Sequence, residues 1–242
     1  MTHRADMPPF LILSTGHPTA SMRRHGSFAH WIRVAAGLDR DAAVVIDVEH
    51  GEPLPERAGF AGALVTGSAA MVTEHLDWSE RCAAWLREAG QAGLPLLGIC
   101  YGHQLLAYAF AGEVGYNPNG REMGTVDIDL TAAAAADPLF AGLPVRMPVQ
   151  STHLQSVLRP PPDAVVLAGN AHDACHAMRW GRSAWGVQFH PEFSTVHMRG
   201  YIRARAEALA QEGRSASALL DAVTAAPAAR RVLRRFVRHA RR

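Results

Sequence analysis

The sequence predicts an α/β fold: a three-layer, flavodoxin-like, mostly parallel sheet with helices on both faces, an antiparallel strand extension and a helical C-terminus. In the first 111 residues, short apolar runs alternate with segments of helical periodicity, which is typical of parallel strands buried on both faces. From about residue 113 to 180, short strand patterns follow one another with few helices between them, which indicates antiparallel pairing. From residue 195 onward the pattern is helical.

The first half supplies the parallel strands and the helices that cover them. The expected strands are residues 10–15, 42–48, 63–66 and 95–100, and the expected helices are residues 28–36, 78–89 and 104–111. Ligands of such sheets bind beyond the carboxyl ends of the strands. Gly67, Cys100 and His190 all follow apolar strands, so we expect them at that edge.

The second half supplies the extension and the helical end. Its expected strands are residues 113–116, 125–130, 145–152, 164–168, 174–180 and 185–193, and its expected helices are residues 196–212, 216–224 and 228–239. No linker rich in proline, glycine or serine divides the chain. We therefore expect one domain over residues 1–242, with a core at about 10–193 and a C-terminal helical extension at about 195–242.

Composition excludes several classes of function. All 24 basic residues are arginine, so chemistry based on a lysine nucleophile or Schiff base is excluded. Three cysteines (Cys82, Cys100 and Cys175) form an odd set without the spacing of a disulfide framework, which favours a reducing compartment. Residues 1–9 resemble neither a signal peptide nor a membrane span. We expect a cytoplasmic protein that binds neither membrane nor nucleic acid.

The most informative motif is a cysteine that ends an apolar run between two glycines. Gly98 and Gly102 flank Cys100 at a distance of two residues. Glycine is required where a tight strand-to-helix turn leaves no room for a Cβ atom, and such a turn presents a nucleophile at the end of the sheet. The start of the following helix favours the thiolate, which is the reactive form. A buried structural cysteine is the alternative interpretation.

A histidine and a carboxylate follow a second apolar run far downstream. His190 and Glu192 are separated by Pro191 and lie two residues apart, so in an extended segment their side chains project to the same face. This arrangement suits a general base and the carboxylate that orients it. We expect His190 to take the proton of Cys100 and return it, while Glu192 fixes the histidine tautomer.

These two motifs resemble the class I glutamine amidotransferases, whose catalytic triad is Cys, His and Glu in this order. The similarity runs from about residue 10 to 193. It implies attack of the Cys100 thiolate on the γ-carboxamide of glutamine and a γ-glutamyl thioester that water hydrolyses. It also implies that the backbone N–H groups of Gly67 and Tyr101 form the oxyanion hole. Candidates for holding the γ-glutamyl group are Gln104, Thr152, His153, Leu154 and Gln155.

The sequence departs from the family pattern at two points. Many relatives carry a Gly-Gly-Pro-x-Ser loop where this chain has Thr-Gly-Ser-Ala-Ala at residues 66–70, and some carry His-Gly-Asp where this chain has His-Leu-Gln at residues 153–155. Trp78 and the Gly-Ser-Phe segment at residues 26–28 are similar to the γ-glutamyl peptidases, although aromatic core residues are the alternative interpretation. How the protein binds the amino-acid end of its substrate, and which partner it has, therefore stay open.

Three functions remain compatible with the residues. An amidotransferase would pass ammonia from glutamine to a separate synthase subunit. A stand-alone γ-glutamyl peptide hydrolase would act alone on larger γ-glutamyl compounds, and a non-catalytic binding protein would keep the triad only as pocket lining. No phosphate loop or dinucleotide fingerprint is present in these residues, so we expect no cofactor. We expect no metal either, because a metal bound to the Cys100 thiolate would stop it from acting as a nucleophile.

The last 15 residues combine seven arginines with an apolar stripe. A basic amphipathic helix of this kind can bind nucleic acid, an anionic membrane or an acidic partner. More commonly such a helix packs its stripe on its own domain and leaves its charges in water. We expect the second arrangement.

Overall fold

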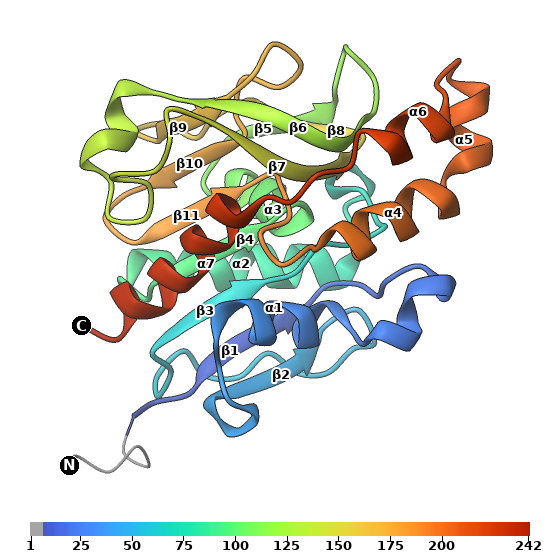
Figure 1. Cartoon of the computed structure of the whole chain (residues 1–242). Coiled ribbons are helices and arrows are strands. Elements are labelled where there is room, and N and C mark those ends of the chain that lie inside the picture. The colour runs from blue at the N-terminus through green and yellow to red at the C-terminus, as the bar shows by residue number, and fades with distance from the viewer. Residues whose placement is uncertain (1–6) are drawn as a thin grey trace.

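The computed structural model describes residues 7–242, so most of the polar N-terminal stretch 1–9 lies outside the described residues. A nine-stranded mixed sheet runs through the molecule in the order β2-β1-β3-β4-β11-β10-β9-β6-β7 (Figure 1). Its strands are β1 (Phe10–Ser14), β2 (Ala43–Asp47), β3 (Gly62–Val65), β4 (Leu96–Ile99), β6 (Glu122–Leu130), β7 (Arg146–His153), β9 (Val165–Gly169), β10 (Ala177–Trp180) and β11 (Ala184–Val187).

The sheet has a parallel half and an antiparallel half, as expected. Strands β2, β1, β3, β4 and β11 are all parallel, and their order along the chain gives the 2-1-3-4-5 arrangement of flavodoxin-like folds. Strands β10, β9, β6 and β7 continue the sheet through antiparallel pairs. Strands β1, β3, β4 and β11 are fully buried, because helices cover both faces of the parallel half.

Helices α1 (Phe28–Ala36) and α7 (Pro227–Ala240) cover one face of the sheet, and α2 (Asp77–Gln91) and α3 (Tyr101–Ala109) cover the other. Side chains of β1 alternate between the two layers: Phe10 and Ile12 pack with α1 and α7, while Leu11 and Leu13 pack with α2 and α3. This alternation follows from the two-residue period of a strand. The predicted three-layer α/β fold is therefore confirmed.

A third apolar cluster holds the remaining helices near the carboxyl ends of the strands. Helices α4 (Thr195–Ala204), α5 (Ala206–Gln211) and α6 (Ala216–Asp221) surround this cluster, where Met198, Ile202 and Leu209 meet Trp31 and Phe193. Phe28 and Trp31 are buried in this cluster, and Trp78 is partly buried against the layer of α2 and α3. No described helix is long and apolar enough to cross a membrane.

The basic C-terminal helix packs on its own sheet. Val232, Leu233 and Phe236 of α7 are fully buried against β1 and α1, and the intervening Arg234 and Arg235 donate hydrogen bonds to backbone carbonyls of neighbouring segments. The predicted surface helix with a buried stripe is confirmed. Because α7 forms part of the main core, residues 227–240 are integral to the layered structure rather than an appendage to it.

Several predicted boundaries are wrong. The expected helix 104–111 begins at Tyr101, and the expected strand 185–193 ends at Val187. The expected helix 196–212 is interrupted at Arg205, and the structure contains a strand, β8 (Gln155–Arg159), that was not expected. Strand β8 pairs with β5 (Glu113–Tyr116) in a separate two-stranded sheet. The short 3₁₀ helices Ala20–His25, Arg40–Ala42, Val72–Glu74 and Ala132–Ala136 were not expected either.

Candidate active site

Cys100 lies on a strained turn between β4 and α3. Its backbone has φ 54° and ψ −103°, a region that residues with a side chain rarely adopt outside functional sites. A Cβ atom on Gly98 would lie 2.2 Å from the carbonyl oxygen of Gly102, and one on Gly102 would lie 2.6 Å from that of Val65. Both glycines are therefore required for the turn, as the sequence predicted.

His190 and Glu192 form a buried pair beyond the end of β11. The Nδ1 atom of His190 lies 2.7 Å from Oε1 of Glu192, and the two side chains are 3% and 0% exposed. The backbone N–H of His190 donates to the carbonyl oxygen of Gln150 at 2.8 Å, and its ring stacks on Phe193 with 4.1 Å between the centroids. A turn, rather than the expected extended strand, places the two side chains side by side.

The backbone of Gly67 lies between the cysteine and the histidine. A Cβ atom on Gly67 would lie 3.2 Å from Cε1 of His190 and 3.7 Å from Cβ of Cys100. Strands β3, β4 and β11 are neighbours in the sheet, and Cys100 donates its backbone N–H to Val187 at 2.8 Å (Figure 1). The parallel order therefore brings together three residues that are far apart in the sequence.

The electrostatics of the pair favour a charged imidazole. Burial lowers the pKa of His190, but the negative charges of Glu192 and of the Cys100 thiolate outweigh it and raise that pKa to about 10. Within residues 7–242, the Nε2 atom of His190 has no hydrogen-bond partner. This nitrogen is free to exchange a proton with a reacting group.

The other two thiols lie in a different environment. Burial raises the pKa of Cys82 to about 12, and burial with the nearby charge of Asp173 does the same for Cys175. Both thiols are therefore held in the protonated form at neutral pH. Cys100 lines a cavity with a volume of about 100 Å³.

Every residue predicted to hold substrate lines the cavity beside Cys100. Its lining includes Tyr101, Gln104, Thr152, His153, Leu154 and Gln155. The thiol of Cys100 donates to the carbonyl oxygen of Thr152 at 3.7 Å. The backbone N–H groups of Gly67 and Tyr101, the expected oxyanion donors, make no backbone hydrogen bond in the part of the chain that the structure describes.

Several of these side chains are already bonded within the protein. The amide of Gln104 donates to the carbonyl oxygen of Gln155 at 2.6 Å and to Oε1 of Gln188 at 3.0 Å. His153 lies 3.1 Å from the carboxylate of Glu122, and the amide of Gln155 donates to Thr73. These residues shape the cavity mainly through their backbone and their mutual contacts.

The cavity also contains residues that the sequence did not single out. Arg121 and Arg205 line it together with residues 68–71. Arg121 donates through Nε to Glu212 at 2.9 Å, whereas the buried Nε of Arg205 has no hydrogen-bond partner among residues 7–242. No local motif marks either arginine, because both reach the cavity only through long-range packing.

Two groups of possible metal ligands come together among the described residues. One contains His17, Glu49 and His50, and the other contains Glu122, His153 and His176.

Comparison with known proteins decides the family. The family model described as glutamine amidotransferase class-I matches residues 26–205. The chain belongs to the class I glutamine amidotransferase family. Its relatives include the glutamine-hydrolyzing GMP synthase of Aeropyrum pernix, which is 35% identical over 79% of this chain and 34% of the relative. The amidotransferase chain thus spans about a third of that relative.

Two further curated relatives differ in their names. A subunit of the glutamine-hydrolyzing GMP synthase of Pyrococcus abyssi is 35% identical over 53% of the amidotransferase chain and 67% of the relative. Gamma-glutamyl-L-1-hydroxyisopropylamide hydrolase of a Pseudomonas species is 31% identical over 64% of the chain and 54% of the relative.

Solved structures agree with the fold. A glutamine amidotransferase of Thermotoga maritima is 18% identical with a TM-score of 0.75, covering 96% of this chain and 98% of that one. Glutamine amido transferase from Methylobacillus flagellatus is 23% identical with a TM-score of 0.77, covering 96% and 95%.

Proposed function

We propose that the chain hydrolyses the γ-carboxamide of glutamine through Cys100, His190 and Glu192. The observation that carries the proposal is the convergence of a strained cysteine turn with a buried histidine–carboxylate pair across Gly67. A nucleophile, a base and a group that orients the base are the parts that acyl transfer needs. Family membership supports the same chemistry.

The proposed reaction has two steps. The Cys100 thiolate attacks the γ-carbonyl carbon, and the resulting oxyanion accepts hydrogen bonds from the N–H groups of Gly67 and Tyr101. His190 protonates the departing nitrogen, so ammonia leaves and a γ-glutamyl thioester remains. Water, deprotonated by His190, then attacks the thioester, which releases glutamate and returns the proton to the site.

Two features of the cavity fit a glutamyl substrate. The guanidinium groups of Arg121 and Arg205 place positive charge at its wall, which suits the α-carboxylate. Thr152 and Leu154 line the same cavity and are our candidates for contacts with the γ-glutamyl end. A second protein that consumes the ammonia is part of the proposal, supported by relatives that are named as one subunit of a GMP synthase.

A second candidate is hydrolysis of a larger γ-glutamyl amide by the chain alone. The relative named Gamma-glutamyl-L-1-hydroxyisopropylamide hydrolase favours it. Both candidates use the same thioester but differ in the leaving group, which is ammonia in the first and an amine in the second.

A release assay separates the two candidates. The purified chain is incubated with glutamine and with γ-glutamyl amides of increasing size, and glutamate, ammonia and amine are quantified. Preference for glutamine supports the amidotransferase, and full turnover of larger amides with little glutaminase activity supports the hydrolase. Release that persists in Cys100→Ser would contradict both candidates, because neither has another nucleophile.

A further inference from the structure

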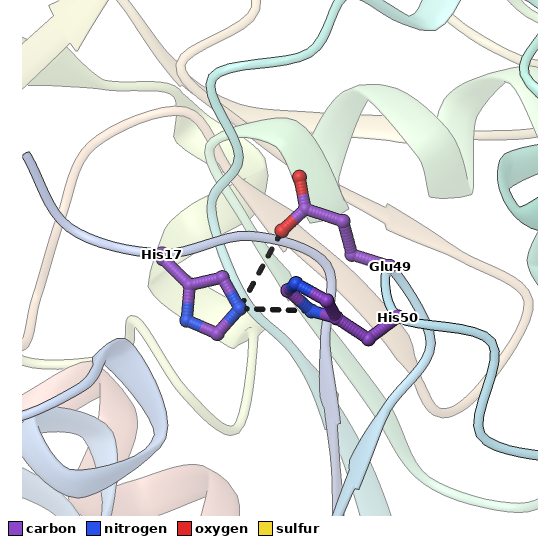
Figure 2. Close-up of side chains that lie close together, drawn as sticks. All are labelled: His17, Glu49 and His50. Carbon is purple, nitrogen blue, oxygen red and sulfur yellow. Dashed lines mark hydrogen bonds and ion pairs between the residues drawn. The ribbon is translucent and has the colours of Figure 1, made fainter.

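Two histidines and two carboxylates gather at the surface, outside the candidate active site. They are His17, Asp47, Glu49 and His50, all between about a quarter and two thirds exposed. Figure 2 shows the ring of His17 directed toward the carboxylate of Glu49 and toward the ring of His50. None of the four lines the cavity beside Cys100.

The parallel pairing of β1 with β2 brings these residues together. Ser14 lies opposite Asp47 in the register, so the two chain segments leave the sheet at the same level. His17 and His50 each lie three residues beyond that pair. Residues from two separate loops therefore face each other at the carboxyl edge of the sheet.

The turn after β2 holds its side chains in place. Val48 donates its N–H to Ser14 at 3.1 Å, and Glu52 donates its N–H to Asp47 at 3.0 Å. The carboxylate of Asp47 accepts the backbone N–H of His50 at 3.2 Å. This bonding fixes the orientation of the potential ligands, which lowers the cost of ordering them around an ion.

The ligand atoms of His17, Glu49 and His50 all lie within 4.8 Å of one another, and Asp47 approaches the two histidines through different oxygens. Nε2 of His17 lies 3.2 Å from Nδ1 of His50, 3.3 Å from Oδ2 of Asp47 and 3.6 Å from Oε2 of Glu49. Nδ1 of His50 lies 3.2 Å from Oδ1 of Asp47. Tetrahedral Zn²⁺ with bonds of about 2.0–2.2 Å separates its ligand atoms by about 3.3–3.6 Å.

One proton cannot serve all the close contacts in this group. Nε2 of His17 carries at most one proton, but three possible acceptors lie within 3.6 Å of it. A single cation placed among the ligand atoms would contact both histidines and offset the charge of the two carboxylates. Imidazole nitrogen with carboxylate oxygen is a ligand set that suits Zn²⁺ better than Mg²⁺ or Ca²⁺.

We propose that His17, Glu49 and His50, with Asp47 beside them, form a binding site for a divalent transition-metal ion of the Zn²⁺ type. The buried group around Glu122 is less suited, because one oxygen of Glu122 already accepts from Ser151 at 2.7 Å and contacts His153 at 3.1 Å. Gly16, which precedes His17, packs closely on the cavity residue Ser68, because a Cβ atom on Gly16 would lie 2.7 Å from Cα of Ser68. The surface site is therefore close to the candidate active site.

The test is a zinc titration of the full, untagged chain against a chromophoric chelator. The Cys100→Ser background removes the accessible thiol as a competing ligand. We expect one Zn²⁺ per chain, with binding weakened at least about tenfold in His17→Asn and in His50→Asn, since even outer-shell changes cost about 10–100-fold in metal affinity. Addition of excess Mg²⁺ should not displace the zinc.

A matched control replaces a histidine that pairs with one carboxylate only. His75 lies 2.8 Å from Glu80 at the surface, and its φ of 49° is tolerated by asparagine, so His75→Asn should bind zinc as the background protein does. Thermal melts establish that each variant is folded. Binding of Co²⁺ with the intense visible absorption of a tetrahedral site would support the geometry. Absence of zinc binding, or equal binding in all three variants, would overturn the proposal.

Discussion

Replacing Glu192 with glutamine removes the charge that orients His190 while keeping the size of the side chain. The carboxylate bonds Nδ1 at 2.7 Å and is fully buried, so no solvent screens it. The rise of the His190 pKa from its ordinary value of 6.5 to about 10 corresponds to about 5 kcal/mol in favour of the imidazolium.

Glu192 shares this stabilisation with the Cys100 thiolate, so we assign roughly 2–3 kcal/mol to the carboxylate. The imidazolium forms when His190 accepts a proton, and Glu192→Gln should therefore lower kcat/KM by about 30–150-fold. The assay is γ-glutamyl hydrolysis at several pH values, with the preferred donor from the release assay. The pH at which the imidazolium deprotonates should also fall by about two units.

Two further variants sharpen this test. Glu192→Asp keeps the charge but withdraws it by one methylene, so we expect an intermediate loss. Glu207→Gln removes an exposed charge outside the site and should leave the rate unchanged. A folded Glu192→Gln enzyme with kcat/KM within about threefold of the wild type would refute the assigned role.

Three other predictions use the same structure. Iodoacetamide at neutral pH should modify Cys100 alone in the native protein, because the pKa values of Cys82 and Cys175 are about 12; comparable labelling of Cys82, read by peptide mass analysis, would contradict this. Gly98→Ala should lower the free energy of unfolding by about 2–3 kcal/mol, because the added Cβ would lie 2.2 Å from a backbone atom. An unchanged urea midpoint would show that the turn tolerates a side chain. Because the folded pKa of His190 is raised, its contribution to stability is present below pH 6.5 and is lost as pH rises through about 10. Urea denaturation at these two pH values should show that the free energy of unfolding falls less with pH in His190→Gln than in the wild type. An equal fall in both proteins would argue against the shift.

The nucleophile turn and the histidine–carboxylate pair could be predicted because their chemistry is local. A glycine two residues either side of Cys100 reports directly on the space available for a Cβ atom, and the structure leaves none there. The two-residue spacing of His190 and Glu192 placed them together even though the extended segment assumed for them is a turn. The parallel half of the sheet followed from the alternation of apolar strands with helices, whereas the order of its strands did not.

The missed features depend on contacts between distant segments. Strand β8 follows β7 after the single residue Leu154, so no turn signal separates the two strands in the sequence. Arg121 and Arg205 reach the cavity from distant segments, and their spacing carries no pattern. The interruption at Arg205 has neither proline nor glycine to mark it. The side chain of His153 contacts Glu122, a partner visible only in three dimensions.

Covalent labelling tests whether Cys100 is a nucleophile that His190 assists. The full chain is treated with a diazoketone analogue of glutamine, and its intact mass is followed with time. We expect one label per chain, located on Cys100, absent in Cys100→Ser and formed more slowly in His190→Ala. Unlabelled wild-type protein, or a label that forms equally fast without His190, would contradict this expectation.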